Sequence, residues 1–170
     1  MFICKYCGTE YTEEIQKCSK CGAQFKESES KSSERTASRT IREVCVKYSD
    51  ENNLYLDDTI SPSRMRAIRK SFKIPEDETV IMVYDDTLFG NNKVGFAVCI
   101  GGLYWNNDWF IDSKRTFLNW PSFMERVANQ EGYHISLGRG DVIGASGTGD
   151  EKTREQYVKL LKEIKLLISS

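Results

Sequence analysis

The sequence lacks a long apolar segment. Its 170 residues open with Met1-Phe2-Ile3 and reach a cysteine at position 4, so they offer no apolar core for a secretory signal peptide. No window approaches the roughly 20 apolar residues that a membrane-spanning helix requires. We therefore expect a cytoplasmic protein, in which thiols stay reduced.

The sequence also lacks a charge excess and is poor in histidine. The formal net charge is −1, so no global field would recruit nucleic acid or an anionic membrane. His134 is the only histidine, and no serine has the surroundings of a nucleophile elbow. Gly144 and Gly149 have the interval of a phosphate-binding loop, but Asp150 stands where that loop requires lysine. No catalytic set emerges, and we expect a protein that is not an enzyme.

What the sequence does contain is a doubled cysteine motif. Residues 4–8 read CKYCG and residues 18–22 read CSKCG, and the aromatic residues Tyr11 and Phe25 follow at matching positions. Four thiolates at this spacing close a tetrahedron around one zinc ion and leave no position for water, as in a structural site. A redox-active pair is the alternative, and two matched pairs with glycines fit it poorly. We expect one structural Zn²⁺ held by Cys4, Cys7, Cys18 and Cys21.

Composition divides the chain into three parts. Residues 1–25 form the cysteine module, which is expected to fold around its metal with Tyr11 and Phe25 packed over the site. Residues 26–40 contain no large apolar side chain and are expected to be a flexible linker. Residues 41–170 must hold the main core.

Three helices are predicted in this third part. Ile41, Val44, Cys45 and Tyr48 have helical spacing, although the alternation of Val44, Val46 and Tyr48 also permits a strand. A second helix begins at Ser61-Pro62 and ends before Pro75. A terminal amphipathic helix, capped by Asp150, carries a stripe made of Tyr157, Leu160, Leu161, Ile164, Leu167 and Ile168.

Between the second and the last helix the pattern changes to short β-rich segments. These segments are residues 79–84, 93–100, 103–105, 109–111, 115–120, 133–137 and 141–145. Short turns join them and helical spacers are missing, which favours an antiparallel sandwich or barrel. We expect the core to contain Cys45, Cys99 and the aromatic residues Trp105, Trp109, Phe110, Phe117 and Trp120.

Two resemblances accompany these patterns. Residues 4–25, with the doubled CxxCG, resemble the zinc-ribbon modules of bacterial proteins. The runs AIRKSFKIPEDE, YDDTLFGNNKVGFAVCIGGLYWNND and TFLNWPSF, within residues 61–168, resemble a PH-like domain of uncharacterised, often zinc-ribbon-bearing bacterial proteins. The second resemblance implies an α+β fold: a bent, seven-stranded antiparallel β-barrel or sandwich capped by a C-terminal helix. We expect residues 41–170 to form this PH-like domain with an N-terminal helical extension. The resemblance implies no activity, because fold does not give function.

A basic stripe and an acidic pair complete the candidate sites. Arg66, Arg69, Lys70 and Lys73 recur at helical spacing opposite the apolar side of the second helix. The stripe is either a solvated face, neutralised by the acidic residues 76–78, or a surface for anionic lipid or nucleic acid. Asp85 and Asp86 are expected to end a strand and point to opposite faces. A zinc-binding adaptor whose partner is a protein is the expected function, and anionic-lipid or nucleic-acid binding through residues 62–73 is the alternative.

Overall fold

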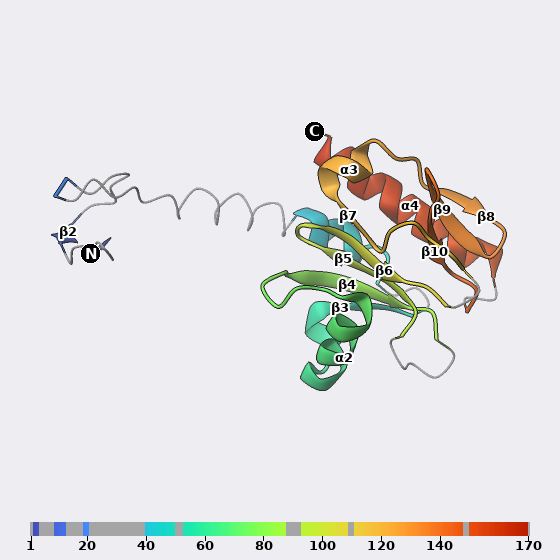
Figure 1. Cartoon of the computed structure of the whole chain (residues 1–170), viewed down its shortest axis with the longest axis horizontal. Coiled ribbons are helices and arrows are strands. Elements are labelled where there is room, and N and C mark those ends of the chain that lie inside the picture. The colour runs from blue at the N-terminus through green and yellow to red at the C-terminus, as the bar shows by residue number, and fades with distance from the viewer. Residues whose placement is uncertain are drawn as a thin grey trace. The chain divides into compact units, whose positions relative to one another are not determined.

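The computed structural model describes residues 2–3, 9–12, 19–20, 40–49, 53–87, 93–108, 111–147 and 150–169. The chain divides into two compact units, Met1–Ala37 and Ser38–Ser170 (Figure 1). Within the described ranges, none of the helices has the length and apolar character needed to cross a membrane.

The first unit contains a small antiparallel sheet. Strand β1 (Phe2–Ile3) pairs with β2 (Glu10–Tyr11), with Phe2 opposite Tyr11 and Ile3 opposite Glu10. The Tyr11 hydroxyl accepts a hydrogen bond from the Ser19 backbone N–H at 3.1 Å and forms a second one with the Ser19 hydroxyl at 3.1 Å. The hairpin is thereby joined to residue 19.

The second unit is an α+β structure built on two antiparallel sheets. The larger sheet has the strand order β3-β4-β5-β6-β7. Its strands are β3 (Leu54–Leu56), β4 (Val80–Asp85), β5 (Gly95–Cys99), β6 (Gly102–Asn106) and β7 (Phe117–Asn119). The smaller sheet has the order β10-β9-β8, with β8 (Asn129–Glu131), β9 (His134–Gly138) and β10 (Asp141–Gly144).

The helices begin where the sequence places caps. Residues 40–46 are helical, which excludes the strand alternative for that segment, and a short 3-10 turn, η1, spans Asp57–Thr59. Helix α2 (Pro62–Phe72) begins after Ser61, whose hydroxyl accepts from the Arg64 N–H. Helix α4 (Glu151–Ile168) begins after Asp150, whose carboxylate accepts from the Lys152 N–H. Both expected helix starts are confirmed.

The core lies on both faces of the larger sheet. On one face, residues of β4, β5 and β6 pack against β9, β10, α4 and the helical segment 40–46. On the other face, Ile68 and Phe72 of α2 cover Val83 and Ala97. Figure 1 shows α2 and α4 on opposite sides of this sheet. The apolar stripe predicted on α4 is confirmed, because Tyr157, Leu160, Leu161 and Ile164 are buried.

Three expectations need correction. Ile111 lies outside any strand, while residues 109 and 110 fall outside the described residues. Trp120 begins α3 (Trp120–Met124) instead of ending a strand, because the Asn119 side chain caps the Ser122 N–H and Pro121 follows in the first turn. Phe117 is 38% exposed on the edge strand β7, where it stacks on Tyr104 with 4.3 Å between ring centroids.

Candidate functional site

The four predicted zinc ligands, Cys4, Cys7, Cys18 and Cys21, lie outside the described residues. Their described neighbours belong to one small structure. Strands β1 and β2 flank the first cysteine pair in the chain, and the bond between Tyr11 and Ser19 reaches the residue that follows Cys18. In the parts of the chain that the structure does describe, no group of His, Cys, Asp and Glu side chains is arranged to hold a metal ion.

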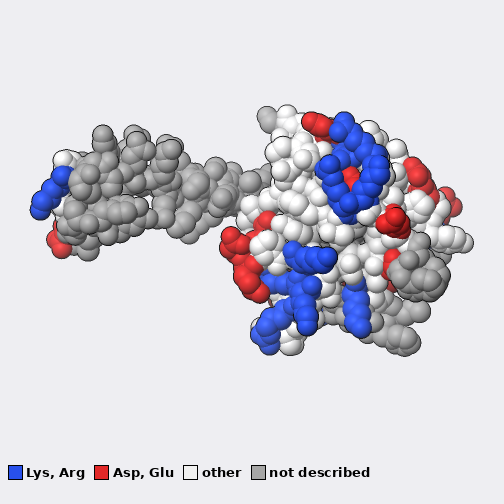
Figure 2. All heavy atoms as spheres, viewed as in Figure 1, with Lys and Arg blue, Asp and Glu red and all other residues white. Residues whose placement is uncertain are grey.

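The predicted basic stripe on α2 is divided by the structure. Arg66, Lys70 and Lys73 are exposed, and Figure 2 shows basic side chains on the surface over this helix. Arg69 has a structural role, because its guanidinium donates to the carbonyl oxygens of Pro75 at 2.5 Å and Glu78 at 2.7 Å. Three of the four stripe residues therefore face solvent, and the fourth fastens the loop that follows α2.

The acidic segment 76–78 does not neutralise the stripe through Glu78. The Glu78 carboxylate accepts from the backbone N–H groups of Thr79 at 2.9 Å and Gly101 at 3.1 Å. It also accepts from the Tyr104 hydroxyl at 3.5 Å. These donors hold the Glu78 carboxylate at the turn between β5 and β6.

Asp85 ends strand β4 and Asp86 follows it, and the two carboxylates have partners on opposite sides of the sheet, as expected. Asp85 is 1% exposed and its carboxylate lies 3.2 Å from the Arg64 guanidinium of α2. The same guanidinium lies over the Tyr55 ring, 4.0 Å from its centroid. Asp85 thus ties α2 to the sheet and is held by a helix residue 21 positions away.

Asp86 is surrounded by hydrogen-bond donors. It accepts from the Tyr84 hydroxyl, from the Gly147 N–H at 2.7 Å and from the Ser146 N–H at 3.1 Å. Burial nevertheless raises the pKa of Asp86, and the donors only partly offset this effect. The pKa of the Tyr84 hydroxyl is also raised, first by burial and then by the Asp86 charge. The pair joins β4 to the segment that leads into α4.

A second buried carboxylate forms an ion pair beside the smaller sheet. Asp141 and Arg126 are 1% and 4% exposed, and their charged groups lie 3.0 Å apart. The Arg126 guanidinium also donates to the Gly138 carbonyl at 3.0 Å, and the Lys165 ammonium contacts the Arg126 carbonyl. These contacts join the β9–β10 turn to the end of α4.

The thiols and the histidine of the second unit are those of Cys45, Cys99 and His134. Cys45 and Cys99 are fully buried, as predicted, and burial raises the pKa of the Cys45 thiol to about 12. His134 lies at the start of β9, and its ring is 3.8 Å from the exposed Glu131 carboxylate. A thiol with such a raised pKa stays protonated at neutral pH. His134 is not among the residues that line the pocket between β8 and α4.

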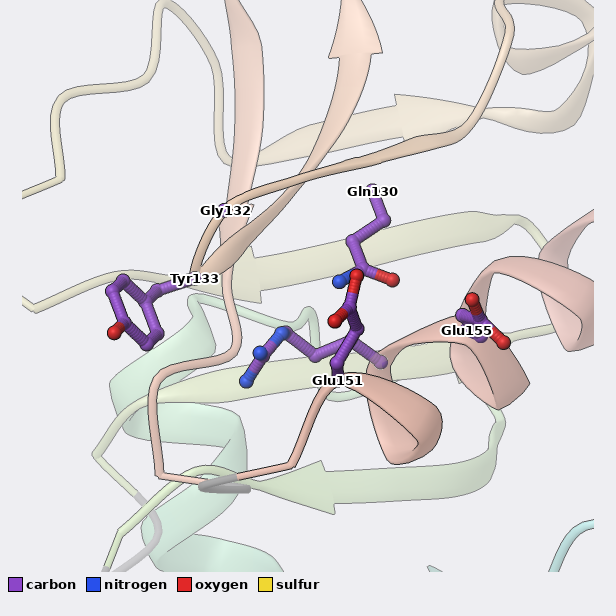
Figure 3. A pocket seen from close by; sticks show the side chains of 6 residues that line it. Gln130, Gly132, Tyr133, Glu151 and Glu155 are labelled. Atoms are coloured by element: carbon purple, nitrogen blue, oxygen red, sulfur yellow. The ribbon is translucent and has the colours of Figure 1, made fainter.

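An open pocket of about 540 Å³ lies between the β8–β9 turn and the first turns of α4. It is lined by Gln130, Gly132, Tyr133, Glu151, Arg154 and Glu155. Figure 3 shows Gln130 and Glu151 pointing toward each other, with Tyr133 and Glu155 toward the two ends. The sequence interpretation missed this site, because residues 129–131 are all polar and give no strand signal.

The chain matches no known protein family model, no curated protein and no solved structure. Its function has to be inferred from its own residues.

Proposed function

We propose that this protein is a non-enzymatic, cytoplasmic adaptor, in which a structural zinc ribbon is tethered to a PH-like unit that binds another protein. The doubled Cys-x-x-Cys-Gly motif carries the proposal. The arrangement of β1, β2 and Ser19 supports it, because it joins the segments next to the two cysteine pairs. Such proximity is what one shared metal ion requires.

The donor set fits zinc and a structural role. Cys4, Cys7, Cys18 and Cys21 supply four thiolates, which fill a tetrahedral zinc site and leave no position for water. A unit of this size buries too little apolar surface to fold on burial alone, so bound zinc would supply the missing folding free energy.

The order of elements in the second unit supports the PH-like proposal. Five strands in sequential antiparallel order are followed by three more in a second sheet, and a helix of 18 residues ends the unit. The resemblance of residues 61–168 implies seven antiparallel strands capped by a C-terminal helix, and that range holds the seven strands β4 to β10 followed by α4. Strand β3 (Leu54–Leu56) precedes the range and adds an eighth strand. The proposal of a binding function is also supported by three buried carboxylates that have structural roles. Asp85, Asp86 and Asp141 are each held by partners that join structural elements.

The zinc proposal is tested by metal content in the purified full-length protein. We expect about one zinc per chain, as the four-thiolate site requires, and we expect Cys18→Ser to lose it. The matched control is Ser19→Ala, which changes the next residue and removes no ligand. A Cys18→Ser protein that keeps its zinc would contradict the proposal.

The adaptor proposal is tested by affinity capture with the full-length chain. We expect a protein to be retained in stoichiometric amount, because the proposed activity is binding. The capture is repeated with Cys18→Ser and with substitutions on the second unit, which assigns the contact to one of the two units. Failure to retain any protein would contradict the proposal.

A second function is favoured by one observation. Arg66, Lys70 and Lys73 are exposed on one helix, as a surface for anionic lipid or nucleic acid would require. We expect vesicle or single-stranded DNA binding at low salt to weaken as salt is raised and to fall in an Arg66→Gln/Lys70→Gln variant. Absence of binding at low salt would eliminate this candidate.

A further inference from the structure

The pocket between β8 and α4 has the features of a peptide-binding site. We propose that it binds an extended segment of a partner protein and seats one lysine or arginine side chain of that segment between Tyr133 and the carboxylates of Glu151 and Glu155. This inference rests on the proposed protein-binding function of the second unit, to which it adds a site and a class of partner.

The first support is the edge of strand β8. Strand β9 lies on one side of β8, and no other strand pairs with its second side among the described residues. Glu131 faces His134 across a two-residue turn in which Gly132 has a φ of +60°. In such a hairpin the pair next to the turn is hydrogen-bonded. Gln130, the residue before Glu131, therefore directs its backbone N–H and C=O away from β9. An extended peptide pairs with backbone groups of this kind.

The second support is the sign of the accessible charge. Glu151 and Glu155 line the pocket and are exposed, and Glu131 is exposed on the adjoining strand. Among the described residues of the lining, Arg154 is the one cation, and it is only 5% exposed. A bound group therefore meets carboxylates first, which favours a cationic side chain over an anionic one.

The third support is Tyr133. This side chain is 69% exposed at the β8–β9 turn, and the Arg154 guanidinium lies 5.3 Å from its ring centroid. An exposed aromatic ring attracts a cation and packs against the aliphatic stem of lysine or arginine. Tyr133 lines the same pocket as Glu151 and Glu155. Tyrosine is also among the residues that most often dominate binding at interfaces.

The dimensions suit one side chain and a short backbone contact. The pocket has a volume of about 540 Å³ and is open to solvent. Strand β8 spans only three residues. The proposal therefore predicts weak, reversible binding by a short peptide. Affinity in the full partner would come from additional contacts or from the zinc ribbon.

The proposal is tested on the full-length, zinc-loaded protein with blocked pentapeptides as probes. One probe carries a central lysine between valines, with threonines at both ends. The second replaces that lysine with glutamate, and the third N-methylates the central backbone to prevent strand pairing. Binding is followed by backbone amide NMR shifts. We expect the lysine peptide to shift the amides of Gln130, Gly132 and Tyr133, the glutamate peptide to leave them unchanged, and the methylated peptide to bind more weakly.

Variants separate the local contact from a general charge effect. We expect Glu151→Gln/Glu155→Gln to weaken the lysine peptide by about threefold to tenfold, since exposed ion pairs are individually weak. We expect Tyr133→Ala to weaken it by a similar factor of about five. The matched control, Glu76→Gln/Asp77→Asn, removes two exposed carboxylates from the loop after α2 and should change nothing.

Several results would overturn the proposal. These are shifts elsewhere in the second unit, equal binding of the glutamate peptide, equal weakening by the control variant, or the same shifts caused by raising the protein concentration without peptide. The last result would assign the pocket to a second copy of the chain. Failure of the proposed function can be distinguished from failure of this inference. The proposed function fails when the protein holds no zinc or captures no partner protein, whereas this inference fails in the pentapeptide binding experiment.

Discussion

Asp86 shows how a single buried carboxylate organises the second unit. Among the described residues, four groups donate to its carboxylate: the Tyr84 hydroxyl, the N–H groups of Ser146 and Gly147, and the Ser146 hydroxyl. The site is also crowded, because a methyl group on Gly147 would come within 2.1 Å of the Asp86 carbonyl oxygen. The segment before α4 therefore approaches the end of β4 so closely that only glycine fits at position 147.

We predict that Asp86→Asn destabilises the protein by about 1–3 kcal/mol, because its amide group would face donors that need an acceptor. The free energy of unfolding is measured with urea and compared with that of Asp77→Asn, an exposed carboxylate whose loss should have little effect. Equal stability of the Asp86→Asn variant and the unchanged protein would show that the four donors do not depend on this carboxylate.

The same residue predicts a pH dependence. Burial raises the pKa of Asp86 above its ordinary value of 3.8, so the native chain binds more protons than the unfolded chain between these two values. The contribution of Asp86 to stability is full below the ordinary value and declines as pH rises through the folded-state pKa. We expect the stability difference between the unchanged protein and Asp86→Asn to shrink with rising pH in this window. A difference that grows would show that the donors outweigh burial.

At the scale of secondary structure, side chains cover the outer edge of β10, and no strand of the described residues pairs with that edge. The Asn107 amide donates to the Val142 carbonyl at 2.8 Å and accepts from the Gly144 N–H at 2.8 Å. The Ser113 hydroxyl accepts from the Val142 N–H at 3.0 Å. These contacts use the backbone groups of an edge strand and thereby remove a template for unwanted pairing.

We predict that Asn107→Ala costs about 1–3 kcal/mol, because it leaves two backbone groups of β10 without their partner. Hydrogen exchange of the Gly144 amide should accelerate more than exchange in β5. Asn129→Ala, on the exposed strand β8, is the control and should leave that exchange unchanged. Unaltered protection of Gly144 in Asn107→Ala would show that this side chain does not hold the edge.

The elements that the sequence predicted well carry their own signals. Helix α2 begins with Ser61 and Pro62, and α4 combines an Asp150 cap with an apolar stripe. Strand β8 has no such signal: Asn129, Gln130 and Glu131 form a strand because β9 pairs with them across a tight turn. Helix α3 did carry a signal, since Asn119 and Pro121 repeat the cap-and-proline pattern of α2, but its five residues are too few to show a helical period. The pocket depends on β8, so it could not be predicted from the sequence.

At the scale of the whole molecule, the two units differ in what stabilises them. The unit Ser38–Ser170 has apolar clusters on both faces of its larger sheet, and the helical segment 40–46 contributes Ile41, Val44 and Cys45 to one of them. The unit Met1–Ala37 is much shorter, and it contains the four predicted zinc ligands. We expect burial to stabilise the unit Ser38–Ser170 and bound metal to stabilise the unit Met1–Ala37.

Metal removal should therefore separate the two units. We predict that a strong chelator releases zinc and shifts the amide resonances of Ile3, Glu10 and Tyr11, because β1 and β2 are too short to persist without the metal. Resonances of α4 and the thermal midpoint of the second unit should not change, because the four cysteines belong to the other unit, Met1–Ala37. Cys18→Ser should reproduce the chelated spectrum and show no further response to chelator, whereas Ser19→Ala should respond like the unchanged protein. If chelation instead lowered the midpoint of the second unit, the stability of that unit would depend on the metal, and the two units would have to be understood as one cooperative structure.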